Sequence, residues 1–154
     1  MAKLVGARGC GYVKSAEFIF NFNDTAIDSV SKTEKSFGSN FNDNIVLDCI
    51  NMPVGAQFIG GEVIVETAGV GPTAYTIALG VAGAPAQYLA ATSLLAAART
   101  PLPLLLTVNN ALGSNNGQNI RMTIASTVAN ATAGRVRVSV QYKLDGQIME
   151  VVAA

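Results

Sequence analysis

A strictly alternating segment near the end of the chain, residues 134–146, constrains the fold more than any other feature. Alternation with a period of two is typical of a β-strand that has one face on a core and the other in water. The apolar face carries Val136, Val138, Val140, Tyr142 and Leu144, and the polar face carries Arg135, Arg137, Ser139, Gln141, Lys143 and Asp145. No residue pattern in this segment is typical of a catalytic site. The segment therefore favours a function based on surface contacts over catalysis.

Shorter alternating segments occur between residues 44 and 124, separated by turns rich in Gly, Pro and Asn. Such evenly spaced short strands predict a β-sandwich or barrel. The inward residues would be Ile45, Leu47 and Cys49; Val63 and Val65; Tyr75, Ile77 and Leu79; Leu104, Leu106 and Val108; and Ile120, Met122 and Ile124. Residues 87–98 are rich in Ala and Leu, which favours one short helix there. We therefore expect an all-β sandwich over residues 44–154, within a single domain overall.

Residues 1–43 differ in composition and form an expected N-terminal arm with the first strand or strands. Phe18, Phe20 and Phe22 alternate, which predicts an extended segment with an aromatic edge that contacts a partner. Residues 1–15 hold too few apolar side chains for a core of their own. A flexible tail and an arm that becomes ordered on a neighbouring subunit are both compatible with this composition.

Charge is scarce and balanced: 13% of the 154 residues are charged, with ten basic and ten acidic side chains. A net charge of zero lacks the basic footprint of nucleic-acid binding, so no nucleic-acid partner is expected. A surface this poor in charge is expected to be partly covered by neighbouring protein.

The uncharged stretch 68–98 raises the question of a membrane span, but glycines and prolines interrupt it repeatedly. A spanning helix needs about 20 predominantly apolar residues with its backbone hydrogen bonds satisfied internally. We therefore expect no membrane association. The charged residues among positions 1–20 also argue against a signal peptide.

Catalytic and metal chemistry has little support, because the chain contains no histidine. Glu62 and Glu66 would lie about 13 Å apart along a strand, too far for the two carboxylates of a glycosidase. Asp24, Asp28 and Asp43 offer oxygen ligands, but their spacing matches no calcium loop. We expect no enzyme, no cofactor and no metal. Cys10 and Cys49 are expected to be reduced thiols, with a disulfide as the less favoured alternative.

Arg135 and Arg137 share the polar face of the last strand with Lys143. A solvated strand face is the favoured interpretation. The alternative is a docking surface for an acidic partner, whose binding would weaken with salt.

Four segments, residues 52–63, 88–92, 97–100 and 131–138, in this order resemble the capsid decoration (cement) proteins of tailed bacteriophages. The resemblance covers about residues 44–146. It implies a jelly-roll β-sandwich on the outer surface of a virion assembled in the host bacterial cytoplasm. It also implies the major capsid protein and further copies of this chain, as a homodimer or homotrimer, as partners. No catalytic residue comes with this resemblance.

The apolar segment 101–106 departs from the family pattern, so Leu102 and Leu104 are candidate partner contacts. Three other functions are weighed against the decoration role. A receptor- or carbohydrate-binding sandwich of a phage fibre or tail is the main alternative, although the chain has no tryptophan for a sugar platform. A small enzyme and the capsid shell protein itself are the others.

Overall fold

The structure, a computed structural model, describes residues 13–38, 43–54, 56–102 and 119–144. Every regular element in these ranges is a β-strand. In chain order the strands are β1 (Lys14–Asn21), β2 (Thr25–Ile27), β3 (Glu34–Ser36), β4 (Ile45–Ile50), β5 (Ala56–Val70), β6 (Ala74–Val81), β7 (Ala84–Ser93), β8 (Ala98–Pro101), β9 (Ile120–Thr127) and β10 (Ala133–Leu144).

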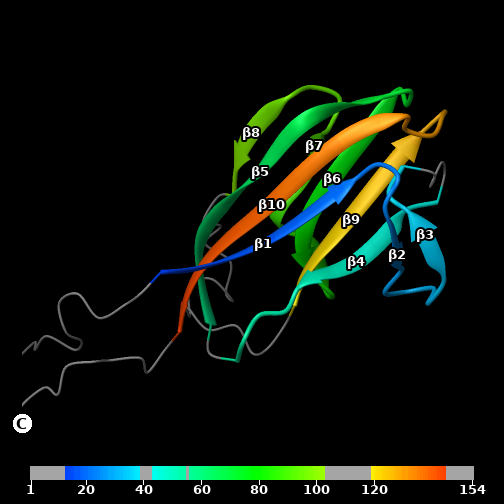
Figure 1. Ribbon diagram of the computed structural model, residues 1–154. Helices are drawn as coiled ribbons and strands as arrows, with labels where there is room; N and C mark the ends of the chain where they lie inside the picture. Colours follow the sequence, from blue (N-terminus) through cyan, green and yellow to red (C-terminus); the bar gives the residue numbers. More distant parts are fainter. Residues whose placement is uncertain (1–12, 39–42, 55, 103–118, 145–154) are drawn as a thin grey trace, which may run out of the picture.

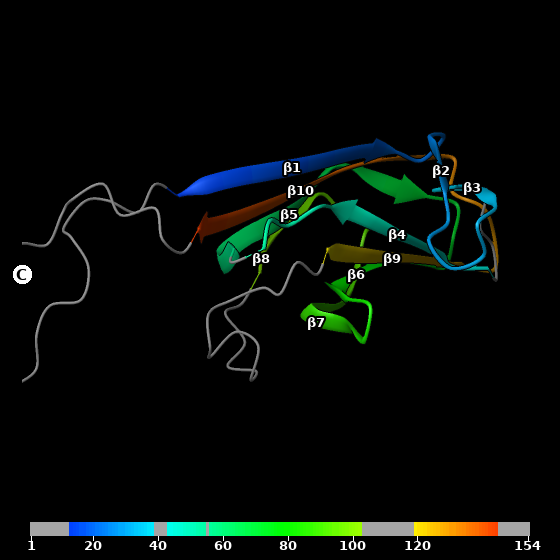
Figure 2. The same ribbon diagram turned by 90° about the horizontal axis from the view of Figure 1, so that it is seen from below.

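Two four-stranded antiparallel sheets, β1-β10-β5-β8 and β4-β9-β6-β7, form the two layers of the molecule (Figure 1). Strands β2 and β3 form a separate hairpin at one end (Figure 2). With the hairpin set aside, the first strand pairs with the last, β4 with β9, β5 with β8, and β6 with β7. The chain thus folds back on itself like one long hairpin. The pairings of β10 with β5 and of β6 with β9 then roll this hairpin into two sheets.

The core lies between the sheets, and β6, β9 and β10 contribute alternate residues to it. From β10, Val136, Val138 and Val140 are buried, as the alternation in residues 134–146 predicts. The facing sheet contributes Tyr75, Ile77 and Leu79 from β6, and Ile120, Met122 and Ile124 from β9. The expected all-β sandwich is confirmed.

The short helix expected over residues 87–98 is wrong. Residues up to Ser93 belong to β7, which pairs with β6, and Ala98 begins β8. Helix propensity is a weak local preference that tertiary packing readily overrides. Here the buried Tyr88 and Leu89 pack into the core from β7. Strand β7 pairs with β6, and strand β8 pairs with β5.

Residues assigned to the N-terminal arm enter the sandwich from position 14 onward. Strand β1 pairs with β10 along its whole length, from Lys14 opposite Tyr142 to Asn21 opposite Arg135. The β2–β3 hairpin then packs beside β4. Residues 1–12 of the expected arm, the expected strand at 104–108, and Cys10 lie outside the described residues.

Candidate interaction surface

Arginine and glutamate side chains alternate across the outer face of the β1-β10-β5-β8 sheet. Glu66 of β5 binds two arginines of β10: Arg135 Nε lies 2.7 Å from Glu66 Oε2, and Arg137 Nη2 lies 2.8 Å from Glu66 Oε1. Arg137 Nη1 also reaches Glu17 of β1 at 3.3 Å. The hydrogen bond donated by Arg137 holds the pKa of Glu66 below its ordinary value and outweighs desolvation, which would raise it. Opposite charges on neighbouring strands stabilise a sheet through such cross-strand pairs.

A second ion pair on the same face joins β8 to β5. Arg99 Nε donates to Glu62 Oε2 at 2.8 Å, and this hydrogen bond lowers the pKa of the Glu62 carboxyl. We call the six side chains of this face the charge ladder: Glu17, Glu62, Glu66, Arg99, Arg135 and Arg137. Three carboxylates and three guanidinium groups leave the ladder neutral.

The ladder explains where the sequence-predicted Arg135 and Arg137 lie. Both project from the outer face of β10, as their alternation indicates, but each has a carboxylate partner within the sheet. Glu62 and Glu66 also share this face, where Glu62 binds Arg99 and Glu66 binds Arg135 and Arg137. An acidic partner would therefore have to compete with Glu66 for both guanidinium groups. The predicted docking role of Arg135 and Arg137 stays a prediction.

Phe18, Phe20 and Phe22 turn toward the interior of the sandwich, because the register with β10 places even-numbered residues of β1 on its inner face. Phe20 is 1% exposed and stacks on Phe37 with ring centroids 4.6 Å apart. Phe18 packs against the same two rings from a half-buried position. Phe20 is therefore a core residue that offers a partner almost no surface. The predicted partner contact stays a prediction for Phe18 and Phe22, which are partly exposed.

Of the two leucines predicted as partner contacts, Leu102 lies in the core at 5% exposure, and its N–H donates to Gly61 O at 2.9 Å. Leu104 lies outside the described residues. The apolar segment that begins at residue 101 thus starts as the continuation of β8 along β5.

An open groove of about 470 Å³ lies between the edge strands of the two sheets, beside the β2–β3 hairpin. Its lining comes from β1, β2, β4 and the residues beside the β2–β3 hairpin, and three of the lining residues are phenylalanines. The lining residues are Phe18, Ile19, Phe20, Asp24, Thr25, Ala26, Phe37, Leu47 and Asp48. Of its two carboxylates, Asp48 is bound by Arg121 and Asp24 by Asn21.

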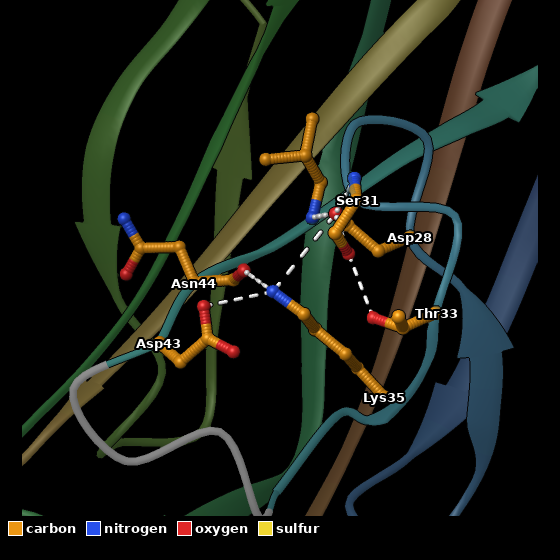
Figure 3. A network of polar contacts seen from close by, with 7 residues as sticks. Asp28, Ser31, Thr33, Lys35, Asp43 and Asn44 are labelled. Carbon is orange, nitrogen blue, oxygen red and sulfur yellow. Dashed lines mark hydrogen bonds and ion pairs between the residues drawn. The ribbon is translucent and has the colours of Figure 1, made fainter.

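A buried carboxylate fixes the hairpin to the sandwich (Figure 3). Asp28 is 2% exposed and accepts hydrogen bonds from the N–H of Ser31 and of Val46, both at 3.0 Å, and from the Ser31 hydroxyl. Burial alone would raise the pKa of Asp28, but these hydrogen bonds and the nearby Lys35 outweigh it and lower the pKa.

Lys35 lies where Asp28 and Asp43 converge. Its Nζ donates to Asp43 Oδ1 at 2.8 Å and to the Asn44 carbonyl at 3.0 Å, and Asp28 Oδ2 lies at 3.9 Å (Figure 3). These carboxylates therefore hold an ammonium group. The described ranges contain no cluster of three or more His, Cys, Asp or Glu side chains suited to a metal ion. Sequence reasoning missed this network, although Asp28 three residues before Ser31 is a signal for a side-chain-capped turn.

Cys49 is a free thiol in the structure, and its Sγ lies 3.4 Å from the Ile120 carbonyl. Burial raises the pKa of Cys49 to about 12, which keeps the thiol protonated and unreactive at neutral pH.

In the described part of the chain, no helix has the length and apolar character needed to cross a bilayer.

The strand order, the continuous apolar core and the ion-paired outer face define a small all-β sandwich protein. No family model matches the chain, and no curated protein matches it. Among solved structures, the chain is similar to a chain of the Cyanophage Pam1 capsid asymmetric unit, with a TM-score of 0.55 and 24% sequence identity. The match covers 94% of this chain and 93% of that chain. At this identity, the likeness is one of fold.

Proposed function

We propose that this chain is a structural virion protein that binds the outside of a phage capsid and cements neighbouring major capsid subunits. The observation that carries the proposal is the likeness, over nearly the full length of both chains, to a chain of a phage capsid asymmetric unit. The four segments at residues 52–63, 88–92, 97–100 and 131–138, which resemble phage decoration proteins, point the same way.

The topology supports the jelly-roll form of sandwich that this role implies. A jelly roll has eight strands in two sheets and is a common architecture of viral capsid domains. Without the β2–β3 hairpin, the strands of this chain stand in the order 1-8-3-6 in one sheet and 2-7-4-5 in the other. This order results when a long antiparallel hairpin is rolled up, and it accounts for every strand of the two sheets.

A cement protein works mechanically, so its body must resist deformation. The charge ladder links the four strands of one sheet, from Glu17 on β1 to Arg99 on β8. Single exposed ion pairs contribute little, but pairs across each of the three strand junctions of the sheet favour one register of the neighbouring strands. Many weak contacts made by many copies on one shell would together bind strongly. Major capsid subunits and further copies of this chain are the proposed partners.

Cosedimentation with purified phage heads tests the proposal. Purified phage heads are mixed with increasing amounts of the protein and pelleted. We expect saturable pelleting, and a higher temperature at which the loaded heads release their DNA. A protein that stays in the supernatant at every concentration contradicts the proposal.

A truncation separates the arm from the body in this assay. Deleting residues 1–12 leaves β1 intact, since β1 begins at Lys14. If residues 1–12 bind a neighbouring subunit, the truncated chain should keep its circular dichroism spectrum and pellet less efficiently with heads. Equal pelleting of the two chains contradicts a role for the arm.

A further inference from the structure

Strand β1 has one side open. It pairs with β10 alone, and Phe22 N, just beyond its end, donates to Gly134 O at 3.0 Å. In an antiparallel ladder the N–H and C=O of one residue point to the same side, and the side alternates along the strand. The even-numbered residues of β1 therefore bond to β10, and the odd-numbered residues point away from the sheet.

Asn21 is the last residue of β1 whose backbone N–H and C=O point away from the sheet. Both of these groups already have hydrogen-bond partners. Asn21 N donates to Asp24 Oδ2 at 2.7 Å, and Asp24 N donates to Asn21 O at 3.1 Å. In the described part of the chain, the outward groups that remain without a partner are those of Val13, Ser15, Glu17 and Ile19. They form a free edge with Ala16 at its centre.

The other three edges of the two four-stranded sheets are blocked or irregular. On β4, Ser29 N donates to Val46 O, while Asp28 and Ser29 side chains accept from the N–H groups of Val46 and Asp48. Strand β8 has four residues and ends in a proline, and β7 contains a proline and two register shifts against β6. Blocked, short and bulged edges resist pairing with another chain. By contrast, the eight residues of β1 pair with β10 without a register shift.

We propose that β1 pairs antiparallel with β1 of a second copy of this chain, about a two-fold axis that passes through Ala16. This pairing joins the two β1-β10-β5-β8 sheets into one continuous sheet. It specifies the self-association included in the proposed function, but it requires no capsid and can be tested without one.

The register follows from the exposed side chains. With the axis at Ala16, Val13 lies opposite Ile19 of the second copy, and Ser15 lies opposite Glu17 of the second copy. Val13 and Ile19 are 58% and 41% exposed, and each would cover the other. An axis at Glu17 would instead place two carboxylates directly opposite each other, which destabilises a strand pair. The smallest side chain of the free edge, Ala16, sits at the axis.

A cysteine cross-linking pattern tests this register. In a Cys10→Ser, Cys49→Ala background, Ala16→Cys should form a disulfide-linked dimer under mild oxidation, because Cα atoms directly across such a pair lie about 4.5–5.5 Å apart. Ile19→Cys, at a more exposed position, should not link to itself. It should link when mixed with Val13→Cys. Efficient self-linking of Ile19→Cys, or no link in Ala16→Cys, overturns the proposal.

A matched pair of substitutions tests the backbone contact in solution. Glu17→Pro removes an outward N–H that β10 does not use, whereas Glu17→Ala removes the same carboxylate and keeps the N–H. By analytical ultracentrifugation, the wild type and Glu17→Ala should be dimers and Glu17→Pro a monomer with an unchanged circular dichroism spectrum. A wild-type monomer, or a folded Glu17→Pro dimer, contradicts the pairing. Neither result depends on whether heads bind the protein.

Discussion

The carboxylate of Asp28 accepts a hydrogen bond from the backbone N–H of Val46 at 3.0 Å, so a buried side chain of the hairpin segment closes the edge of β4. The same carboxylate accepts from Ser31 N and Ser31 Oγ. Three donors on one buried acceptor make Asp28 the connection between the hairpin and the sandwich.

Replacing Asp28 with alanine should destabilise the protein by about 2–4 kcal/mol, because the N–H groups of Val46 and Ser31 lose a buried, charged acceptor. Urea unfolding followed by circular dichroism measures the change. Asp43→Ala is the control, because Asp43 also binds Lys35 but is 68% exposed. If both substitutions lower the midpoint equally, burial of Asp28 has no special effect.

Acid should destabilise the fold through Asp28, Glu62 and Glu66. Their pKa values are lowered in the folded protein, so at acid pH the unfolded chain binds more protons. Their stabilising contribution is full above the unfolded pKa values, near 4, and is lost as the pH falls through the folded values. Urea midpoints measured from about pH 7 to pH 2 should therefore fall, and the fall should be shallower in Asp28→Asn. An equally steep fall in that variant excludes a contribution from Asp28.

Gly60 and Gly61 of β5 offer a matched pair for backbone packing. Both have φ values that favour glycine, 152° and 147°. A Cβ on Gly61 would collide with the Ser139 carbonyl of β10, whereas one on Gly60 meets nothing within 4 Å. Gly61→Ala should therefore cost at least about 2 kcal/mol more than Gly60→Ala. Equal unfolding midpoints would show that β5 and β10 can separate at this point without cost.

Exchanging the charges of one ion pair tests the ladder. Arg99→Glu alone places two carboxylates together on β5 and β8 and should lower the melting temperature at low salt. Combining it with Glu62→Arg should restore the melting temperature, because the pair is re-formed with its signs reversed. In about 1 M salt the single variant should approach wild type, since screening weakens exposed charges. A double variant no more stable than the single one contradicts pairing.

The sequence predicts the layers of this fold better than its edges. Alternation at Val136, Val138 and Val140 is a property of the strand itself, so the buried face of β10 is readable without its neighbours. For β1, the same alternation is visible at Phe18 and Phe20, but which face is inner depends on pairing with β10, more than a hundred residues away in the chain.

Three features can be assigned only from the folded chain. Tyr88 and Leu89 lie in an Ala-rich stretch that favours a helix locally, and pairing with β6 decides for a strand. Asp28 resembles a surface or calcium-binding carboxylate until Val46, distant in sequence, is brought beside it. For Arg137, the sequence leaves open a solvated strand face or a docking surface for an acidic partner. The structure places Glu66 and Glu17 within ion-pair distance of it.

Cryo-electron microscopy of phage heads saturated with the protein tests the central claim most directly. The account predicts density on the outer surface of the shell into which the sandwich fits, with each copy in contact with at least two major capsid subunits. Heads whose outer surface is unchanged after incubation, or copies that each touch a single subunit, would contradict a cementing role.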